Sequence, residues 1–434
     1  MRRFCLLVAA VAWSAPVTAA TIAFRGGTVV LGDGGEPIVG GTVVVRDGKV
    51  VAAGRSVAIP PGAELVDASG QWVTPGIVAG MARIGLVDVD LGVDGADDAE
   101  AAKSPFGAAI DASRAVNPVM MTVAVSRAAG VTRAIIAPGA GASIFDGQGA
   151  VIDLAADPDP ITRRRAFQWV ELGEEGADKA GGSRASADAV FRNALAEARE
   201  LARGATAGGR AKRRDDVLLT RLDAAALVPV VEGRQLLVVH VERAADILNV
   251  LGLRHDYPRL KLAIVGAGEG WTVARQLAES GVWVIANPVE DLPASFETLA
   301  ATQSNVGRMR AAGVKVAVGL VGDSRNARTL RQYAGNLVAL GKVPGATGVS
   351  WGEAFALISS RPAEAIGLGG SIGRLSPGAH GDVVLWSGDP LENASSATAV
   401  WIDGVRQPID NHQTDLRDRY RTIERQDLPP AYRR

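Results

Sequence analysis

The stretch QWVTPGIVAGMARIGL, residues 71–86, joins two different sequence patterns. Before it, residues 21–75 contain short β-rich runs separated by glycine turns, and Asp47-Gly48 is typical of a two-residue β-hairpin turn. After it, apolar runs alternate with stretches of helical periodicity. The stretch is therefore the point at which a small antiparallel β unit passes into a larger α/β body.

The larger body contains eight apolar runs that we interpret as strands. Residues 187–203 and 273–279 are examples of the helical stretches between them. Strands rich in Val, Ile, Leu and Ala that alternate with helices favour a parallel sheet covered by helices, and eight of them predict a closed (β/α)8 barrel of the TIM type. The runs are Ile77–Leu86, Thr132–Ala137, Ala150–Leu154, Ala166–Leu172, Leu236–Val241, Lys261–Val265, Val282–Ala286 and Val314–Leu320.

A second group of β-rich runs lies near the C-terminus. Asp382–Trp386 and Ala399–Ile402 have strand patterns, and Asp403-Gly404 repeats the hairpin signal. We therefore expect both ends of the chain to build one small β-sandwich around the inserted barrel. The predicted organisation is a signal peptide (1–20), the N-terminal part of the sandwich (21–75), the barrel (76–366), the C-terminal part of the sandwich (367–409) and a polar tail (410–434).

The first twenty residues have the pattern of a secretory signal peptide. Met-Arg-Arg is followed by the apolar run Phe4–Trp13 and by small residues up to Ala20, where we expect cleavage. The alternative is a buried N-terminal strand. Cys5, the single cysteine, lies within this segment, so the mature chain would have no disulfide. We expect a periplasmic or secreted protein without a membrane span, since no later run is long and uncharged enough.

The charge balance argues against nucleic acid as a partner. The sequence has 46 basic and 47 acidic residues and a formal net charge of -1. A protein that binds a phosphate backbone usually carries a clear basic excess. We expect a small-molecule substrate or ligand instead, and a homo-oligomer is compatible with the sequence.

Several short motifs follow one another in a characteristic order along the chain. They are VTPGI (73–77), GVT (130–132), GQGAV (147–151), VHVERAADI (239–247), RPAEAIGL (361–368), GRLSPG (373–378), DVV (382–384) and WSGDP (386–390). This order, with a β unit split around a predicted eight-stranded barrel, resembles the amidohydrolase superfamily and most closely its imidazolonepropionase-like branch.

The resemblance implies hydrolysis of non-peptide C–N bonds, in amides or cyclic amides, with one or two divalent metals of the zinc type. The metals would lie at the C-terminal mouth of the barrel, where catalytic groups of this fold gather. It also implies a ligand set: a histidine pair on the first strand, a carboxylate or modified lysine on the fourth, histidines on the fifth and sixth, and an aspartate on the eighth.

Most positions of that ligand set carry other residues here. The first-strand positions fall at Ala79, Met81 and Arg83, and neither a thioether nor a permanent cation replaces a neutral imidazole. Gly266 stands where the sixth-strand histidine is expected. Val321 stands where the eighth-strand aspartate is expected.

Three candidates for site residues remain. His240 matches the fifth-strand ligand, Glu174 is the candidate bridging carboxylate, and Asp323, two residues after Val321, is the candidate catalytic aspartate. The alternative for His240 is a hydrogen-bonded core histidine, and for Glu174 a solvated loop residue. The other histidines are not predicted to lie at the metal site. His255 is predicted in a helix-to-strand loop, His380 in the β unit and His412 in the tail.

This set falls short of the three protein ligands that a catalytic zinc needs. The sequence therefore predicts a degenerate metal site that holds the divalent metal weakly or not at all. Two functions follow from it. One is an exported hydrolase of the family with an incomplete metal centre, and the other is a non-catalytic pseudoenzyme that binds a partner chain or a small ligand. An anionic ligand would suit the charge of Arg83.

Overall fold

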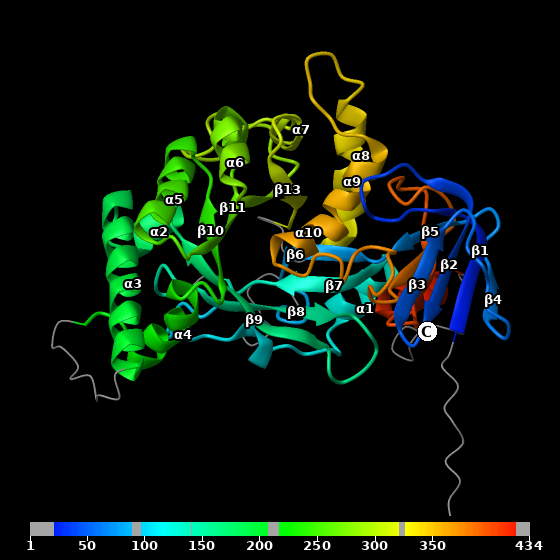
Figure 1. The fold of residues 1–434 in the computed structure, drawn as a ribbon, viewed down its shortest axis with the longest axis horizontal. Helices are drawn as coiled ribbons and strands as arrows, with labels where there is room; N and C mark the ends of the chain where they lie inside the picture. The colour runs from blue at the N-terminus through cyan, green and yellow to red at the C-terminus, as the bar shows by residue number, and fades with distance from the viewer. Residues whose placement is uncertain (1–20, 89–96, 140, 207–216, 321–325, 422–434) are drawn as a thin grey trace, which may run out of the picture.

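The computed structural model describes residues 21–88, 97–139, 141–206, 217–320 and 326–421 (Figure 1). The predicted signal peptide and Asp323 lie outside these ranges. Within them, no helix has the length and apolar character needed to cross a membrane.

The predicted barrel is confirmed. Eight strands form one sheet in the order β13-β12-β11-β10-β9-β8-β7-β6, and a parallel bridge between Gly80 and Gly319 brings its two outer strands together (Figure 1). The strands are β6 (Ile77–Ala82), β7 (Val131–Ile136), β8 (Gly147–Asp153), β9 (Ile161–Glu171), β10 (Leu236–Val241), β11 (Lys261–Gly266), β12 (Trp283–Ala286) and β13 (Lys315–Val318).

The expectation of an entirely parallel sheet was wrong at its third strand. β8 runs antiparallel to both β7 and β9. Its two connections, residues 137–146 and 154–160, are shorter than the crossover of about a dozen residues that parallel neighbours need. The apolar run at 150–154 gave no sign of direction, because buried strands of either orientation have the same composition.

Helices cover the outside of this sheet. The helices predicted at 187–203 and 273–279 are confirmed as α3 and α6, whereas His255 lies in the last turn of a helix, α5, and not in a loop. The helices are α1 (Met121–Ala128), α2 (Glu174–Lys179), α3 (Arg184–Thr206), α4 (Arg221–Val231), α5 (Ala244–Asp256), α6 (Ala274–Ser280), α7 (Asn305–Ala311), α8 (Leu330–Leu340), α9 (Trp351–Leu357), α10 (Ser360–Ala365) and α11 (His412–Tyr420).

Alternation along the strands produces two apolar layers. Val78, Val238 and Ile285 belong to a cluster that fills the barrel, whereas Val239 and Val284 belong to the larger cluster between the sheet and its helices. Because successive residues of a strand point to opposite faces, each strand contributes to both layers. A strand buried on both faces therefore shows a continuous apolar run.

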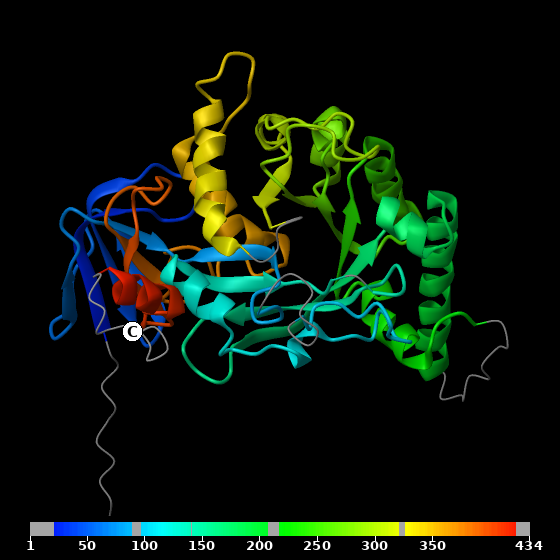
Figure 2. The same cartoon turned by 180° about the vertical axis from the view of Figure 1, so that it is seen from behind.

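The second sheet is built from both ends of the chain, as predicted. In both views the N-terminal strands, in blue, lie beside the C-terminal strands, in orange and red (Figures 1 and 2). The order is β16-β15-β14-β5-β1-β2-β3, with β4 paired to β1. The strands are β1 (Thr21–Val29), β2 (Ile38–Arg46), β3 (Lys49–Gly54), β4 (Glu64–Asp67), β5 (Trp72–Pro75), β14 (Val383–Trp386), β15 (Ala397–Ile402) and β16 (Val405–Gln407).

Both predicted hairpin turns are present. Asp47 and Gly48 have φ values of 51° and 71°, and Asp403 and Gly404 have 49° and 74°. Positive φ at both central residues is the geometry that the Asp-Gly sequence accommodates. These turns set the pairing of β2 with β3 and of β15 with β16.

A buried arginine fastens the second sheet to the barrel. Arg133 of β7 is 1% exposed, and its Nε and Nη2 atoms lie 2.8 Å from carboxylate oxygens of Asp382 and Asp403 respectively. Its Nη1 lies 3.6 Å from Asp153 of β8. The contact is near the start of β7, at the end of the barrel opposite the mouth.

Candidate site at the barrel mouth

The ends of two neighbouring barrel strands bring a histidine between two carboxylates. The register of β9 and β10 pairs Glu171 with His240. Glu242 follows two residues after His240, and alternate residues of an extended segment point to the same side. Glu171, which is distant in sequence, and Glu242, which is close, therefore both meet His240 at the C-terminal mouth. TIM-barrel active sites lie at this mouth.

Both ring nitrogens of His240 are occupied by carboxylates. Nδ1 lies 2.6 Å from Oε2 of Glu171, and Nε2 lies 3.0 Å from Oε1 of Glu242. The indole N–H of Trp169 donates to the other oxygen of Glu171 at 2.6 Å. A histidine with an acceptor at each nitrogen is satisfied only as the imidazolium, because only that form has two N–H donors.

The charges of this group stabilise one another. Burial disfavours the charged form of His240, yet the Glu171 and Glu242 carboxylates raise its pKa well above the usual range. Burial likewise works against the charged form of Glu171, but the His240 imidazolium keeps the pKa of that carboxyl below its usual value. The centre is therefore a carboxylate–imidazolium–carboxylate triad.

Glu242 also fills the space beside Gly266. Its Oε2 accepts a hydrogen bond from the backbone N–H of Gly268 at 2.6 Å. Gly266 has a φ of +88°, and a Cβ atom at this position would lie 2.3 Å from Oε1 of Glu242. The place where a sixth-strand histidine would begin is therefore taken by a carboxylate of this chain.

A lysine completes the group from α2. Nζ of Lys179 lies 2.9 Å from Oδ1 of Asp146 and 2.9 Å from Oε1 of Glu175. Burial raises the pKa of Asp146 to about 7, and the nearby Glu171 carboxylate adds to the effect. On the other side of the triad, burial and the Glu242 carboxylate raise the pKa of Glu290 to about 7. Shifts of this kind gather at functional sites.

Comparison with known proteins agrees with this architecture. The model of the Amidohydrolase family matches residues 273–406. An amidohydrolase structure from Thermotoga maritima has a TM-score of 0.78 and 24% identity, covering 89% of this chain and 99% of that one. Residues 273–406 therefore resemble the Amidohydrolase family, and the chain has the fold of the Thermotoga maritima amidohydrolase.

Two further similarities are weaker or shorter. Molinate hydrolase has a TM-score of 0.51 and 16% identity, with 90% of this chain and 95% of that chain covered. The amidohydrolase tasK of Hapsidospora irregularis is 31% identical over 86 residues. That match spans 19% of this chain and 9% of the relative, so it bears on a small part of either protein.

A divalent metal is typical of amidohydrolases, so we tested whether this donor set fits one. Ligand atoms of Glu171, Glu175 and His240 lie within 4.8 Å of one another. Two ligands of a tetrahedral zinc, each about 2.0–2.1 Å from the ion, are roughly 3.3 Å apart. The 2.6 Å between Nδ1 of His240 and Oε2 of Glu171 is too short for both to be ligands. As arranged, these two atoms fit a shared proton, and an ion held by both side chains would require them to move apart.

The structure places the predicted site residues differently. His240 lies at the mouth of the barrel. Glu174 is exposed at the start of α2, where its backbone N–H donates to Glu297 at 2.8 Å, and its role as a bridging ligand stays a prediction. Asp323, the predicted catalytic residue, is outside the described residues. Met81 is 3% exposed, and Arg83 is paired with Glu100 at 3.2 Å.

Sequence reasoning missed Glu171 and Glu242. Glu171 was counted within the apolar run 166–172, although a glutamate inside a barrel strand is itself a signal, because an unpaired charge is rarely buried. The signal for Glu242 is the sequence His-Val-Glu, because histidine and glutamate lie on the same side of an extended segment.

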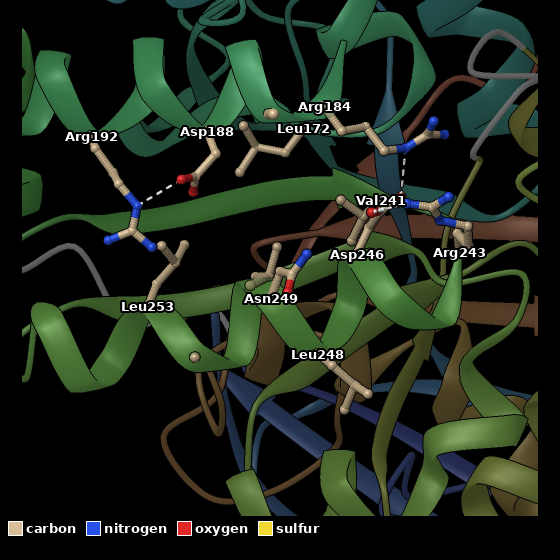
Figure 3. Close-up of a pocket in the computed structure, with 13 residues that line it drawn as sticks. Leu172, Arg184, Asp188, Arg192, Val241, Arg243, Asp246, Leu248, Asn249 and Leu253 are labelled. Carbon is tan, nitrogen blue, oxygen red and sulfur yellow. Dashed lines mark hydrogen bonds and ion pairs between the residues drawn. The ribbon is translucent and has the colours of Figure 1, made fainter.

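A groove on the outside of the barrel is the weaker candidate for a functional site. It has a volume of about 520 Å³ and lies between α3 and α5 (Figure 3). Its charged side chains already pair with one another, as Arg184 does with Asp246 and Arg192 with Asp188, both at 2.8 Å. The histidine held between two carboxylates, and the two nearby carboxyl groups whose pKa values are raised to about 7, lie at the mouth instead.

The triad predicts a pH-dependent stability. The pKa of His240 is higher in the folded chain than in the unfolded one. Its contribution to the free energy of unfolding is therefore complete below about pH 6.5 and is lost as the pH rises through the folded pKa, by up to about 1.4 kcal/mol per pH unit. The destabilisation caused by His240→Asn should shrink from pH 6 to pH 9 in urea unfolding. A difference that is constant across this range would contradict the triad.

Proposed function

We propose that this exported amidohydrolase-superfamily protein binds a small molecule at the barrel mouth and does not carry out metal-dependent hydrolysis. The observation that carries the proposal is the occupation of both His240 ring nitrogens by Glu171 and Glu242. A metal ligand needs a free nitrogen lone pair, and the imidazolium has none. This observation favours the hypothesis of a non-catalytic binding protein over that of a hydrolase with an incomplete metal centre.

The charge of the mouth indicates the chemistry of the ligand. Its carboxyl groups outnumber its cations, Lys179 and His240; they belong to Asp146, Glu171, Glu175, Glu242 and Glu290. A ligand that presents amine or amide N–H donors is complementary to such a surface. The expectation of an anionic ligand rested on Arg83, whose guanidinium is paired with Glu100.

A hydrolase with one metal is the second candidate. The proximity of Glu171, Glu175 and His240 favours it, and the resemblance to the Amidohydrolase family supports a hydrolase function. Its reaction would be that of the superfamily, hydrolysis of non-peptide C–N bonds in amides or cyclic amides. It requires His240 to lose one proton, and the hydrogen bond at that nitrogen, when an ion binds.

Metal content separates the two candidates. We expect the purified mature protein to contain well under one equivalent of zinc, manganese or iron, and chelators to leave its melting temperature unchanged. A metal held at about a thousand times its dissociation constant would add roughly 4 kcal/mol to stability, which is an easily measured shift. Thermal-shift titrations with small amines and amides should stabilise the wild type and not Glu171→Gln.

A stoichiometric metal that is lost in His240→Ala would overturn the binding proposal and favour the hydrolase. Turnover of amides should then depend on the same ion. Arg184→Met, in the outer groove, is the matched control and should leave metal content and ligand binding unchanged.

Export is the second part of the proposal. The basic start, the apolar run and the small residues before Thr21 support cleavage near Ala20 and a periplasmic or secreted location. We expect N-terminal sequencing of the exported protein to begin at or near Thr21. Recovery of exported protein that begins at Met1 would contradict cleavage.

A further inference from the structure

We propose that Lys179 is a built-in cation that takes the place of a divalent metal at the mouth, and that its removal uncovers a metal site on Glu171, Glu175 and His240. The inference rests on the proposed function, since it assumes that the wild type binds no metal there. It goes beyond that function by naming a residue besides His240 that opposes binding of the ion.

Lys179 is held firmly in its position. It ends α2, one turn after Glu175, and its side chain is 11% exposed. Nζ lies 2.9 Å from Asp146, whose own side chain is 2% exposed and also accepts the backbone N–H of Gly141 at 2.8 Å. The ammonium group is therefore fixed by a buried carboxylate and cannot leave the mouth without losing that pair.

Glu175 connects the lysine to the potential ligand set. One of its oxygens lies 2.9 Å from Nζ of Lys179, and it also belongs to the group whose ligand atoms lie within 4.8 Å of one another. A carboxylate in contact with an ammonium is a poor partner for a second cation. Lys179 thus opposes metal binding by this ligand set in two ways. It occupies an oxygen of Glu175, and its positive charge repels a second cation.

The two cations of the mouth account for the charge that a metal would supply. His240 and Lys179 together carry two positive charges, as one divalent ion does. They lie among Asp146, Glu171, Glu175 and Glu242, to which they are paired at 2.6–3.0 Å. Part of the carboxylate charge at the mouth is therefore balanced by side chains of this chain.

Replacing Lys179 by a neutral residue removes this obstacle to metal binding. A divalent ion near Glu175 would no longer lie within a few ångströms of an ammonium, where repulsion is strong even at an effective dielectric constant of about 20. Glu175 would be free to turn toward the ion. His240 can then give up one proton to become a ligand, because metal binding competes with protons for the same nitrogen.

The test compares Lys179→Gln with Lys179→Arg, which keeps the positive charge. Chelator-treated mature protein is titrated with ZnCl₂ or MnCl₂ in a calorimeter. We expect Lys179→Gln to bind one equivalent at least about 100-fold more tightly than the wild type, and Lys179→Arg to behave like the wild type. Adding Glu171→Gln to Lys179→Gln should abolish the gain, which separates this site from adventitious binding elsewhere.

Circular dichroism and thermal melting establish that each variant is folded, and Lys179→Met replaces Lys179→Gln if the latter does not fold. The inference is overturned if the neutral variants bind metal no more tightly than the wild type, while the proposed function survives. If the wild type itself binds one equivalent tightly and Glu171→Gln removes it, the proposed function fails as well.

Discussion

Truncation after Leu368 is expected to leave no folded protein in the soluble fraction. The missing segment contains β14, β15 and β16, and β14 pairs along its whole length with β5. Without it, the backbone groups of β5 are exposed on one side, and the two apolar clusters that contain Trp386 and Trp401 lose these side chains. Expression followed by separation of soluble and pelleted protein measures the effect.

Truncation after Asp410 is the matched control for this experiment. It removes α11, which has no buried residue in its described length, and keeps Pro408, whose carbonyl accepts a hydrogen bond from Arg127. We expect this shorter deletion to leave solubility and melting temperature nearly unchanged. A folded, monomeric barrel after truncation at Leu368 would refute the interdependence of the two sheets.

Replacement of Arg133 by methionine is expected to lower the free energy of unfolding by about 3–5 kcal/mol, because it leaves buried carboxylates without their counter-charge. The side chains of Arg133 and Asp382 are each 2% exposed, so water cannot solvate the remaining carboxylate. Against the effect of burial, the hydrogen bond with His380 and then the Arg133 guanidinium hold the pKa of Asp403 at about 2. Urea unfolding at neutral pH measures the loss.

Arg163→Met tests whether this loss comes from burial. Arg163 is an exposed arginine of β9 in the same sheet, and such substitutions usually change stability by less than about 0.5 kcal/mol. A double variant, Arg133→Met with Asp382→Leu, should recover part of the loss, since paired removal leaves no isolated charge. Equal effects for Arg133→Met and Arg163→Met would exclude the proposed role of Arg133.

The fold could be predicted from the sequence because its signals are local. The run after Pro75 and the hairpins at Asp47 and Asp403 each depend on a few neighbouring residues. The direction of β8 could not be predicted in this way. The direction depends on the length of the connections on either side of the strand. The apolar run begins at Ala150, whereas the strand begins at Gly147, so the sequence pattern makes the first connection seem longer than it is.

The site was only partly predictable, for a different reason. Substitution of the metal ligands is visible at Met81, Arg83 and Gly266, and His240 was singled out. What replaces the ligands is not visible, because the contacts of His240 with Glu171 and of Lys179 with Asp146 join residues that are 69 and 33 positions apart. Such pairings depend on strand register and on the placement of α2, which no local pattern specifies.

The sheet shared by the two chain ends can be completed only late in the synthesis of the chain. The indole of Trp386 donates a hydrogen bond to the hydroxyl of Thr74, 312 residues earlier. A ribosome that adds about 5–20 residues per second needs roughly 15–60 s to make that interval. During this time β5 has no partner on one side, and an open strand edge is a template for pairing with other chains. The delay between the synthesis of its two ends, more than the stability of the finished sheet, therefore determines how long the newly made chain is vulnerable to misassembly.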